Sequence, residues 1–438
     1  MYIQTPKRYR GRQSRSAFSC QRFLMFFLLV IVILVGIGIY QMRDAVRPSL
    51  MQVVDAGVEQ VSVWQATQFA PTPVPTLDPS TVLVDADNNW SVGRVNLALS
   101  TYDEIINSLP NDVGVHVRMA EGYLTRGNIE QALLYADRAV TADPFSADAW
   151  ATRALIYSWN DNGAEGIASA QQALALDANN VRATAYLGYA YYQEDQFTLA
   201  NSRANEAIDL DLDHWSGYWV RGLIRENVIP IDYPGAQTDF ETGYNLAREQ
   251  NPAMAGVIGS GLGRIISIQG NPQRAVELLN EMRTLDDGNR EVLYYLGITH
   301  YRDLGEWGQA QDPFSDCVDV APEDVSCWYM LGRTLFSLDD QEGALQAFEQ
   351  AVELETPFAR HYWWAARSER VLGSCTAATP YLETGYDMVR EGGLPAIEEG
   401  NADLIQAFED ELSTCRVPII PGAPEPERTP EAEPIGDA

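Results

Sequence analysis

Small residues recur at a nearly constant interval through most of this 438-residue chain, and no other feature limits its fold as strongly. The first five positions lie 34 residues apart, and the later steps are 41, 34, 35 and 34 residues. A second series, made up only of alanines, follows 12 to 14 residues behind the first. Apolar residues around both series have helical spacing, so each period predicts two antiparallel helices that cross where their side chains are small. The first series is Ala86, Ala120, Ala154, Gly188, Gly222, Gly263, Gly297, Gly332 and Ala366, and the second is Ala98, Ala132, Ala168, Ala200, Ala236, Ala275, Ala310, Ala344 and Ala378.

The seventh full period shows the pattern most completely, with Trp328, Leu331 and Gly332 in its first half and Ala344 and Phe348 in its second. This pattern resembles the tetratricopeptide repeat, a 34-residue unit of two helices. The resemblance covers roughly residues 80 to 390. It departs from the family pattern in the second period, which has a longer turn, and in the fourth, which contains an insertion with two prolines.

The resemblance implies an all-α fold in which about eight to nine helix pairs stack into a right-handed superhelical solenoid. We expect the solenoid over residues 80–393, with the degenerate first helix of 80–110 as its N-terminal cap. We expect a C-terminal capping helix over 394–417, because Leu404, Phe408 and Leu412 form one apolar face there.

A basic and then apolar segment at the N-terminus predicts a membrane anchor. Residues 1–22 contain six basic and no acidic side chains, and residues 23–42 contain no charge. Twenty helical residues span about 30 Å, the thickness of the hydrocarbon layer. The alternatives are a buried core helix, which rarely lacks charge over this length, and a cleaved signal peptide, which needs a shorter apolar run and an A-x-A-like site. We expect an uncleaved transmembrane anchor in the cell membrane, with 1–22 as a cytoplasmic tail and the rest of the chain extracytoplasmic.

Two further segments flank the repeats. Residues 43–79 combine a helix-compatible stretch with a proline-rich tether, because closely spaced prolines favour an extended spacer. Residues 418–438 are acidic and proline-rich with few apolar side chains, so we expect this tail to be disordered.

Four of the five cysteines follow the predicted anchor, on the side where disulfides persist. Four cysteines allow three connectivities. In the repeat register, Cys317 and Cys327 lie where neighbouring helices meet, whereas Cys375 opens the last second helix and Cys415 closes the antiparallel cap. We therefore expect the pairs Cys317–Cys327 and Cys375–Cys415.

The composition argues against several classes of function. The formal net charge is −31, and the chain after residue 22 has 24 basic and 61 acidic residues, which disfavours nucleic-acid binding. The four histidines lie far apart, so a histidine metal site is not expected. The glycines of residues 259–263 suit a helix crossing better than a phosphate loop, since no strand precedes them. We expect no catalytic activity, cofactor or metal.

The family resemblance also predicts a binding groove. In tetratricopeptide proteins the first helix of each unit lines a concave groove, and repeat positions 2, 5, 9, 12 and 13 point into it. Across eight full units these positions contain seven arginines, Arg182 among them, but four acids. Arginine binds carboxylates through two parallel hydrogen bonds and stacks on aromatic rings. The alternative is that the aromatic side chains only pack adjacent helices. The predicted groove residues are Arg264, Tyr294, Tyr301, Arg302, Tyr329, Arg333, Phe336, Arg360, Trp363, Arg367 and Arg370.

These features predict a membrane-anchored scaffold whose groove binds a peptide or protein partner, in cell-envelope assembly or secretion. The alternative is a receptor that uses the same arginine and aromatic side chains to bind a carbohydrate or an anionic polymer. Lysine occurs once and the other basic residues are arginine, which favours a bacterial protein from a GC-rich genome.

Overall fold

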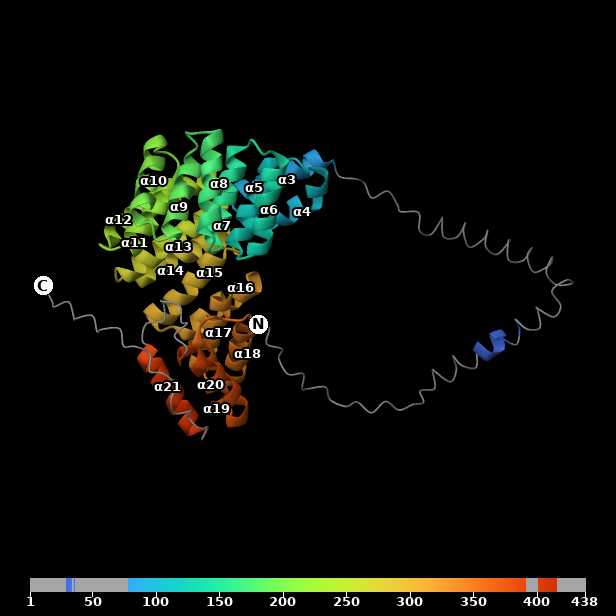
Figure 1. Ribbon diagram of the computed structural model, residues 1–438, viewed down its shortest axis with the longest axis vertical. Coiled ribbons are helices and arrows are strands. Elements are labelled where there is room, and N and C mark those ends of the chain that lie inside the picture. The colour runs from blue at the N-terminus through green and yellow to red at the C-terminus, as the bar shows by residue number, and fades with distance from the viewer. Residues whose placement is uncertain (1–28, 34, 36–77, 391–400, 416–438) are drawn as a thin grey trace. The chain divides into compact units, whose positions relative to one another are not determined.

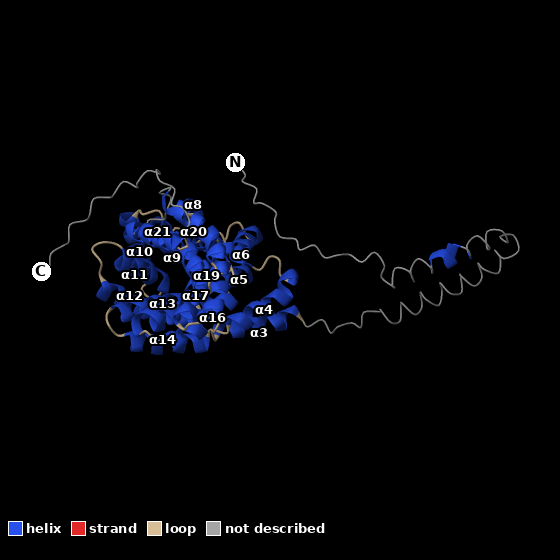
Figure 2. Cartoon of the chain, turned by 90° about the horizontal axis from the view of Figure 1, so that it is seen from below, coloured by secondary structure: helices blue, strands red, loops and turns tan. Residues whose placement is uncertain are grey.

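The computed structural model describes residues 29–33, 35, 78–390 and 401–415 of the chain. In these ranges the regular elements are helices, and Figure 2 shows no strand among them. Residues 79–390 form nine successive helix pairs, followed by α21 (Asn401–Thr414), in an all-α repeat solenoid (Figure 1). The first helices of the pairs are α3 (Pro79–Ser91), α5 (Val113–Thr125), α7 (Ala147–Trp159), α9 (Val181–Gln193), α11 (Trp215–Asn227), α13 (Pro252–Ile268), α15 (Arg290–Ile298), α17 (Val325–Ser337) and α19 (Ala359–Val371). The second helices are α4 (Val95–Ile105), α6 (Ile129–Ala142), α8 (Gly163–Leu176), α10 (Phe197–Leu210), α12 (Tyr233–Gln250), α14 (Pro272–Leu285), α16 (Trp307–Val320), α18 (Gln341–Glu353) and α20 (Cys375–Arg390).

The predicted close crossings between paired helices are present. The nine small residues lie in the first helices, and the nine alanines lie in the second helices. Eight of these alanines are buried, but Ala168 of α8 is exposed, and Gly166 takes its place at the crossing with Ala154 of α7. A Cβ atom added to Gly332 of α17 would lie 2.6 Å from the ring of Phe348 in α18, and one added to Gly297 of α15 would lie 2.6 Å from the ring of Phe314 in α16. Interiors packed this closely leave no room for a methyl group. The first helix therefore has glycine where the second helix presents phenylalanine.

The turn inside each helix pair also repeats. In eight of the nine pairs it contains one residue with positive φ, which is glycine in five pairs. The other three are Asp161, Asp195 and Asp339, with φ of 55°, 56° and 66°. Glycine adopts this left-handed conformation without strain, and aspartate is one of the few other residues that tolerates it. The fifth pair, α11 and α12, differs, because residues 228–232 form a longer connection there.

Side-chain caps fix where many helices begin. Asp112, Asn180 and Asp324 each precede a first helix and accept the backbone N–H three residues later, at 3.0, 2.8 and 2.9 Å. Such a cap satisfies one of the backbone donors that a helix leaves open at its N-terminus.

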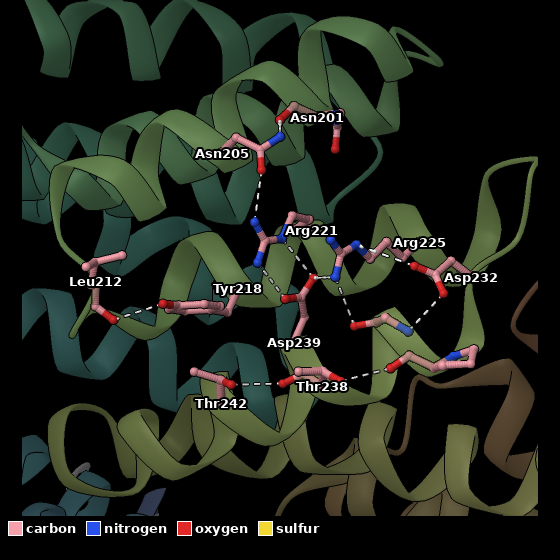
Figure 3. A network of polar contacts seen from close by, with 12 residues as sticks. Asn201, Asn205, Leu212, Tyr218, Arg221, Arg225, Asp232, Thr238, Asp239 and Thr242 are labelled. Atoms are coloured by element: carbon pink, nitrogen blue, oxygen red, sulfur yellow. Dashed lines mark hydrogen bonds and ion pairs between the residues drawn. The ribbon is translucent and has the colours of Figure 1, made fainter.

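A polar network joins the two helices of the fifth pair, α11 and α12, and ties them to the preceding helix α10 (Figure 3). The Asp239 side chain in α12 is 2% exposed, and it accepts hydrogen bonds from Arg221 of α11 at 2.7 and 2.9 Å. Arg225 of α11 lies 2.9 Å from the same carboxylate, and Arg221 also donates to Asn205 of α10 at 2.9 Å. Because two guanidinium groups compensate the buried carboxylate, the network can hold the longer α12 in place.

The curvature of the solenoid brings its first two pairs against the turn that follows α14. Arg126, which caps α5, forms an ion pair with Asp286, and both side chains are 7% exposed. Asn96 of α4 accepts from Arg126 at 2.8 Å and donates to Asp287 at 3.0 Å. Residues about 160 positions apart thus close the first turn of the solenoid.

The predicted C-terminal cap is present as α21, which packs against α20 and α19. Leu404, Phe408 and Leu412 are buried there, as their spacing predicts. The helix begins at Asn401, and residues 394–400 of the predicted cap lie outside the described residues.

Both expected cysteine pairs are joined in the structure. Cys317 is bonded to Cys327, with their Cα atoms 5.8 Å apart. Cys375 is bonded to Cys415, with a Cα–Cα distance of 5.3 Å, and this bond links the start of α20 to the end of the cap.

Several predicted segments lie outside the described residues. These are the basic tail (1–22), most of the predicted anchor (23–42), the tether up to residue 77 and the acidic tail (418–438). Within the anchor, residues 29–33 and 35 are helical. Among the residues that the structure describes, no helix combines the length and hydrophobicity that a membrane crossing requires.

Candidate functional site

Six of the eleven predicted groove residues lie together on α17, α19 and the π-helical turn η2 (Thr299–Leu304). The Cζ atom of Arg333 lies 4.4 Å from the ring centroid of Trp364 and 5.6 and 5.7 Å from those of Tyr301 and Tyr329. Arg367 follows on the next pair, with its Cζ atom 4.9 Å from the Trp363 ring. We call this half-buried set the Arg333 cluster; its members are Tyr301, Tyr329, Arg333, Phe336, Trp363, Trp364 and Arg367.

Arg302 does not join the cluster, although its repeat position predicts that it should. The π-helical turn that contains it has wider hydrogen-bonded rings than an α-helix, and this changes the direction of the side chains that follow. The Arg302 side chain is 58% exposed and pairs with the neighbouring Asp303 at 2.6 Å.

Three further predicted groove residues have other surroundings. Tyr294 packs beneath Arg290, whose Cζ atom lies 4.8 Å from its ring. Arg370 forms an ion pair with Glu411 of α21, so the capping helix already satisfies this guanidinium. Arg360 lies half-buried at the start of α19. None of the three belongs to the Arg333 cluster.

Arg264, the last of the eleven, lines a separate pocket of about 140 Å³ on the inner face of the first turn. Its aromatic wall is formed by Trp159 of α7, Tyr189 and Tyr192 of α9, and Trp219 of α11. The rings of Tyr189 and Trp219 lie 4.9 Å apart, and those of Trp159 and Tyr189 lie 6.0 Å apart. We call this the inner pocket.

The charged side of the inner pocket is compensated within the chain. Arg264 forms an ion pair with Glu226 and donates to the Tyr295 hydroxyl at 2.7 Å. Burial raises the pKa of Glu226, although Arg264 opposes this shift. Glu291 accepts from Arg290 at 2.5 Å. The Arg264 guanidinium, which is predicted to face a ligand, therefore already has two partners within the chain.

Arg182, the groove arginine of the third full unit, is compensated in the same way. It forms an ion pair with Glu121 and donates to Thr152 at 2.9 Å. Glu121 also accepts from Asn251 of the fifth unit at 2.8 Å. These contacts stabilise the first turn of the solenoid.

None of the four aromatic residues of the inner pocket is among the groove residues predicted from the sequence. Tyr189, Tyr192, Trp159 and Trp219 nevertheless hold repeat positions 9, 12, 13 and 5, so the same register applied to the N-terminal units identifies them. Trp364 is different: it holds position 6, which the family register does not assign to the groove.

Other features of the structure do not indicate catalysis. A larger hollow of about 510 Å³ lies between α6 and α8, where Arg153 already pairs with Asp137 at 2.8 Å and with Glu165 at 3.3 Å. Within the described ranges, no group of three or more histidine, cysteine, aspartate or glutamate side chains is placed to bind a metal ion.

Comparisons with known proteins agree with this architecture. The tetratricopeptide repeat family model matches residues 325–356. The peroxisomal targeting signal receptor of Saccharomyces cerevisiae is 24% identical over 294 residues, which are 66% of this chain and 41% of the receptor. The receptor of Eremothecium gossypii is 26% identical over 276 residues, or 62% of this chain and 41% of that protein. This chain thus spans about two fifths of the length of the curated relatives it matches.

A solved structure supports the same fold. A chain of the APC/C hetero-tetramer Cut9–Hcn1 superposes with a TM-score of 0.54 at 15% identity, over 72% of this chain and 59% of that one. The matches are to receptors and repeat proteins, which confirms the expectation that the chain is not an enzyme. They lend no support to a bacterial, membrane-anchored subtype. The chain thus contains a tetratricopeptide repeat at residues 325–356, has the fold of a tetratricopeptide repeat solenoid, and is distantly similar to the peroxisomal targeting signal receptors.

Proposed function

We propose that this protein is a peptide-binding receptor whose inner face holds a segment of a partner protein. The inner pocket is the observation that carries this proposal. At about 140 Å³ it is smaller than the pockets of roughly 300 Å³ or more that take drug-sized ligands and cofactors. Its aromatic wall and its polar Gln193 and Ser260 suit one apolar side chain and the backbone groups beside it.

The names of the curated relatives support a peptide as the ligand class. Both relatives are receptors for a targeting signal. Only this general class is carried over, because the identities are near 25% and the chain covers less than half of each relative.

The proposal includes the membrane anchor. The apolar run at residues 23–42 would hold the solenoid at a cell membrane, with the repeats on the extracytoplasmic side and a role in envelope assembly or secretion. Tethering would raise the local concentration of the receptor near a membrane-bound partner. A reporter that is active only in the cytoplasm, fused after residue 438, should be silent, and strong activity would contradict this topology.

Affinity isolation with the full chain tests the receptor function. Solubilised native membranes are incubated with the wild-type protein, with Tyr192→Ala and with the control variant Trp307→Ala. Trp307 is a matched control because it is an aromatic residue that is 45% exposed on α16. We expect a protein to be retained by the wild type and the control but lost from Tyr192→Ala, with unchanged melting temperatures. Retained material that resists protease and is degraded by glycosidases would favour the carbohydrate receptor instead. If Tyr192→Ala retains the partner as well as the wild type does, the inner pocket is not the binding site.

A further inference from the structure

Arg333 differs from the other inner-face arginines in its electrostatic surroundings. In the described part of the chain it forms no ion pair. Its Nη1 atom donates a hydrogen bond to the Tyr329 hydroxyl at 2.9 Å, and the Tyr301 hydroxyl also interacts with the guanidinium. Its Nε atom is buried without a hydrogen-bond partner among the described residues, a property that it shares with Arg182, Arg264 and Arg367. Four inner-face arginines in other layers each have a carboxylate partner, in the pairs Arg182–Glu121, Arg264–Glu226, Arg302–Asp303 and Arg370–Glu411.

Aromatic rings take the place of a counter-ion around Arg333. The guanidinium lies over Trp364 and beside Tyr301 and Tyr329, and cation–π attraction of this kind is worth about 0.5 to 2 kcal/mol. A half-buried cation gains more from a carboxylate, because charged hydrogen bonds are about twice as strong as neutral ones. Arg367 is the nearest further cation of the cluster, and it makes one long ion pair, at 3.7 Å from Glu411.

The apolar members of the cluster restrict what can carry the carboxylate. Phe336 lies edge-on to Trp364, with ring centroids 5.1 Å apart, and Trp363 lies edge-on to the same ring at 5.0 Å. These rings are half-buried and both contact Trp364, the ring over which the Arg333 guanidinium lies. They therefore offer contact area to an apolar side chain near the charge. A peptide with an acidic group beside an aromatic or aliphatic residue fits both features. A sulfated or phosphorylated polymer would leave the rings without partners.

We propose that Arg333 binds a carboxylate of the partner peptide. An apolar side chain of the same peptide, next to this carboxylate, packs on Phe336 and Trp363. This inference rests on the proposed peptide-receptor function and names the chemistry of its ligand. The carboxylate has two sources, an acidic side chain within the peptide or its C-terminus. The strongly negative chain does not forbid this, since exposed charges farther than about 8 Å are largely screened at physiological salt.

Binding of three five-residue peptides to the full chain tests the inference. Each has leucine and phenylalanine on both sides of the central residue. The first has a central glutamate with both termini blocked, the second a glutamine with both blocked, and the third a glutamine with a free C-terminus. We expect the wild type to bind the first or the third at least ~10-fold more tightly than the second. The indole N–H signal of Trp364 should shift on binding.

Variants assign that preference to Arg333. Arg333→Gln should bind all three peptides equally, and Arg333→Lys should lose most of the preference because it lacks the planar fork. Arg274→Gln, which removes an exposed arginine from α14, should behave as the wild type. If the cluster only packs α17 against α19, both Arg333 variants lower the melting temperature and leave the peptide preference unchanged.

Several outcomes would overturn the inference. The wild type could bind the three peptides equally or bind none of them. Arg333→Gln could also keep the preference for the peptides that have a carboxylate. In each case the receptor function stands or falls separately, because its own test depends on Tyr192 and the inner pocket.

Discussion

The ion pair between Arg126 and Asp286 should hold the first turn of the solenoid closed, and Asp286→Asn tests this. The Asp286 carboxylate accepts two N–H groups of Arg126, one of them at 3.2 Å, and both side chains are 7% exposed. Replacing the carboxylate with an amide leaves the guanidinium buried without its counter-charge. Breaking such a buried pair costs about 3 to 5 kcal/mol. We therefore expect Asp286→Asn to lose that much free energy of unfolding.

A double variant separates the pair from the charge that its disruption leaves behind. Arg126→Met combined with Asp286→Leu removes both charges and keeps apolar volume, so it should cost less than either single change. Arg274→Gln is the control for loss of one arginine. The side chains of Arg274 and its partner Glu277 are 65% and 67% exposed, so this ion pair should contribute less than about 1 kcal/mol to the free energy of unfolding.

Urea unfolding followed by circular dichroism measures these changes, because urea does not screen charge. Repeat arrays can unfold in steps, so hydrogen exchange must show where opening occurs. Faster exchange in Asp286→Asn should begin in residues 113–126 and 252–298, on the two sides of the closure. A loss below 1 kcal/mol, or a double variant that costs the sum of the singles, would refute the assigned role of this pair.

Three further predictions concern stability. Asp339→Gly should raise it by about 0.5 to 1 kcal/mol, seen as a higher urea midpoint, because φ is 66° at this turn. Gly332→Ala should lower it by about 1 to 3 kcal/mol, since the added Cβ meets the Phe348 ring at 2.6 Å, and Phe348→Leu in the same chain should restore part of the loss. Burial, aided by Arg360, lowers the pKa of His361 from 6.5 to about 3, so protonation favours the unfolded chain. The His361 contribution to stability should fall as the pH drops below 6.5, by about 2 kcal/mol at pH 5, and urea titrations at each pH should show that His361→Gln removes this part of the profile. The part that remains belongs to groups such as His214, whose pKa burial lowers to about 4.

The helix pairs could be predicted from the sequence because their determinants are local and repeat. Gly332 and Phe348 belong to one period, and the same relation recurs at Gly297 and Phe314. The repeat register also places Cys375 near Cys415, since a cap must pack on the last pair. Each of these inferences needs only neighbouring units.

The closure of the first turn could not be predicted in this way. Arg126 and Asp286 are separated by 160 positions, and no periodic feature relates them. Their meeting depends on the curvature summed over five helix pairs. The change of direction at Arg302 was likewise hidden, because the π-helical turn has no counterpart in the repeat pattern.

The inner face also has two kinds of layer that the sequence pattern does not separate. In one kind the arginine is neutralised by a carboxylate of the chain, and in the other it lies among aromatic rings. Arg182 and Arg264 are neutralised by Glu121 and Glu226, so their layers consist of internal ion pairs that stabilise the curvature. In the described part of the chain Arg333 has rings but no carboxylate around it. A charge count over the whole groove averages these layers, whereas each part of a ligand contacts one layer. An incoming carboxylate therefore gains most binding free energy in the layer whose arginine has no carboxylate partner within the described part of the chain.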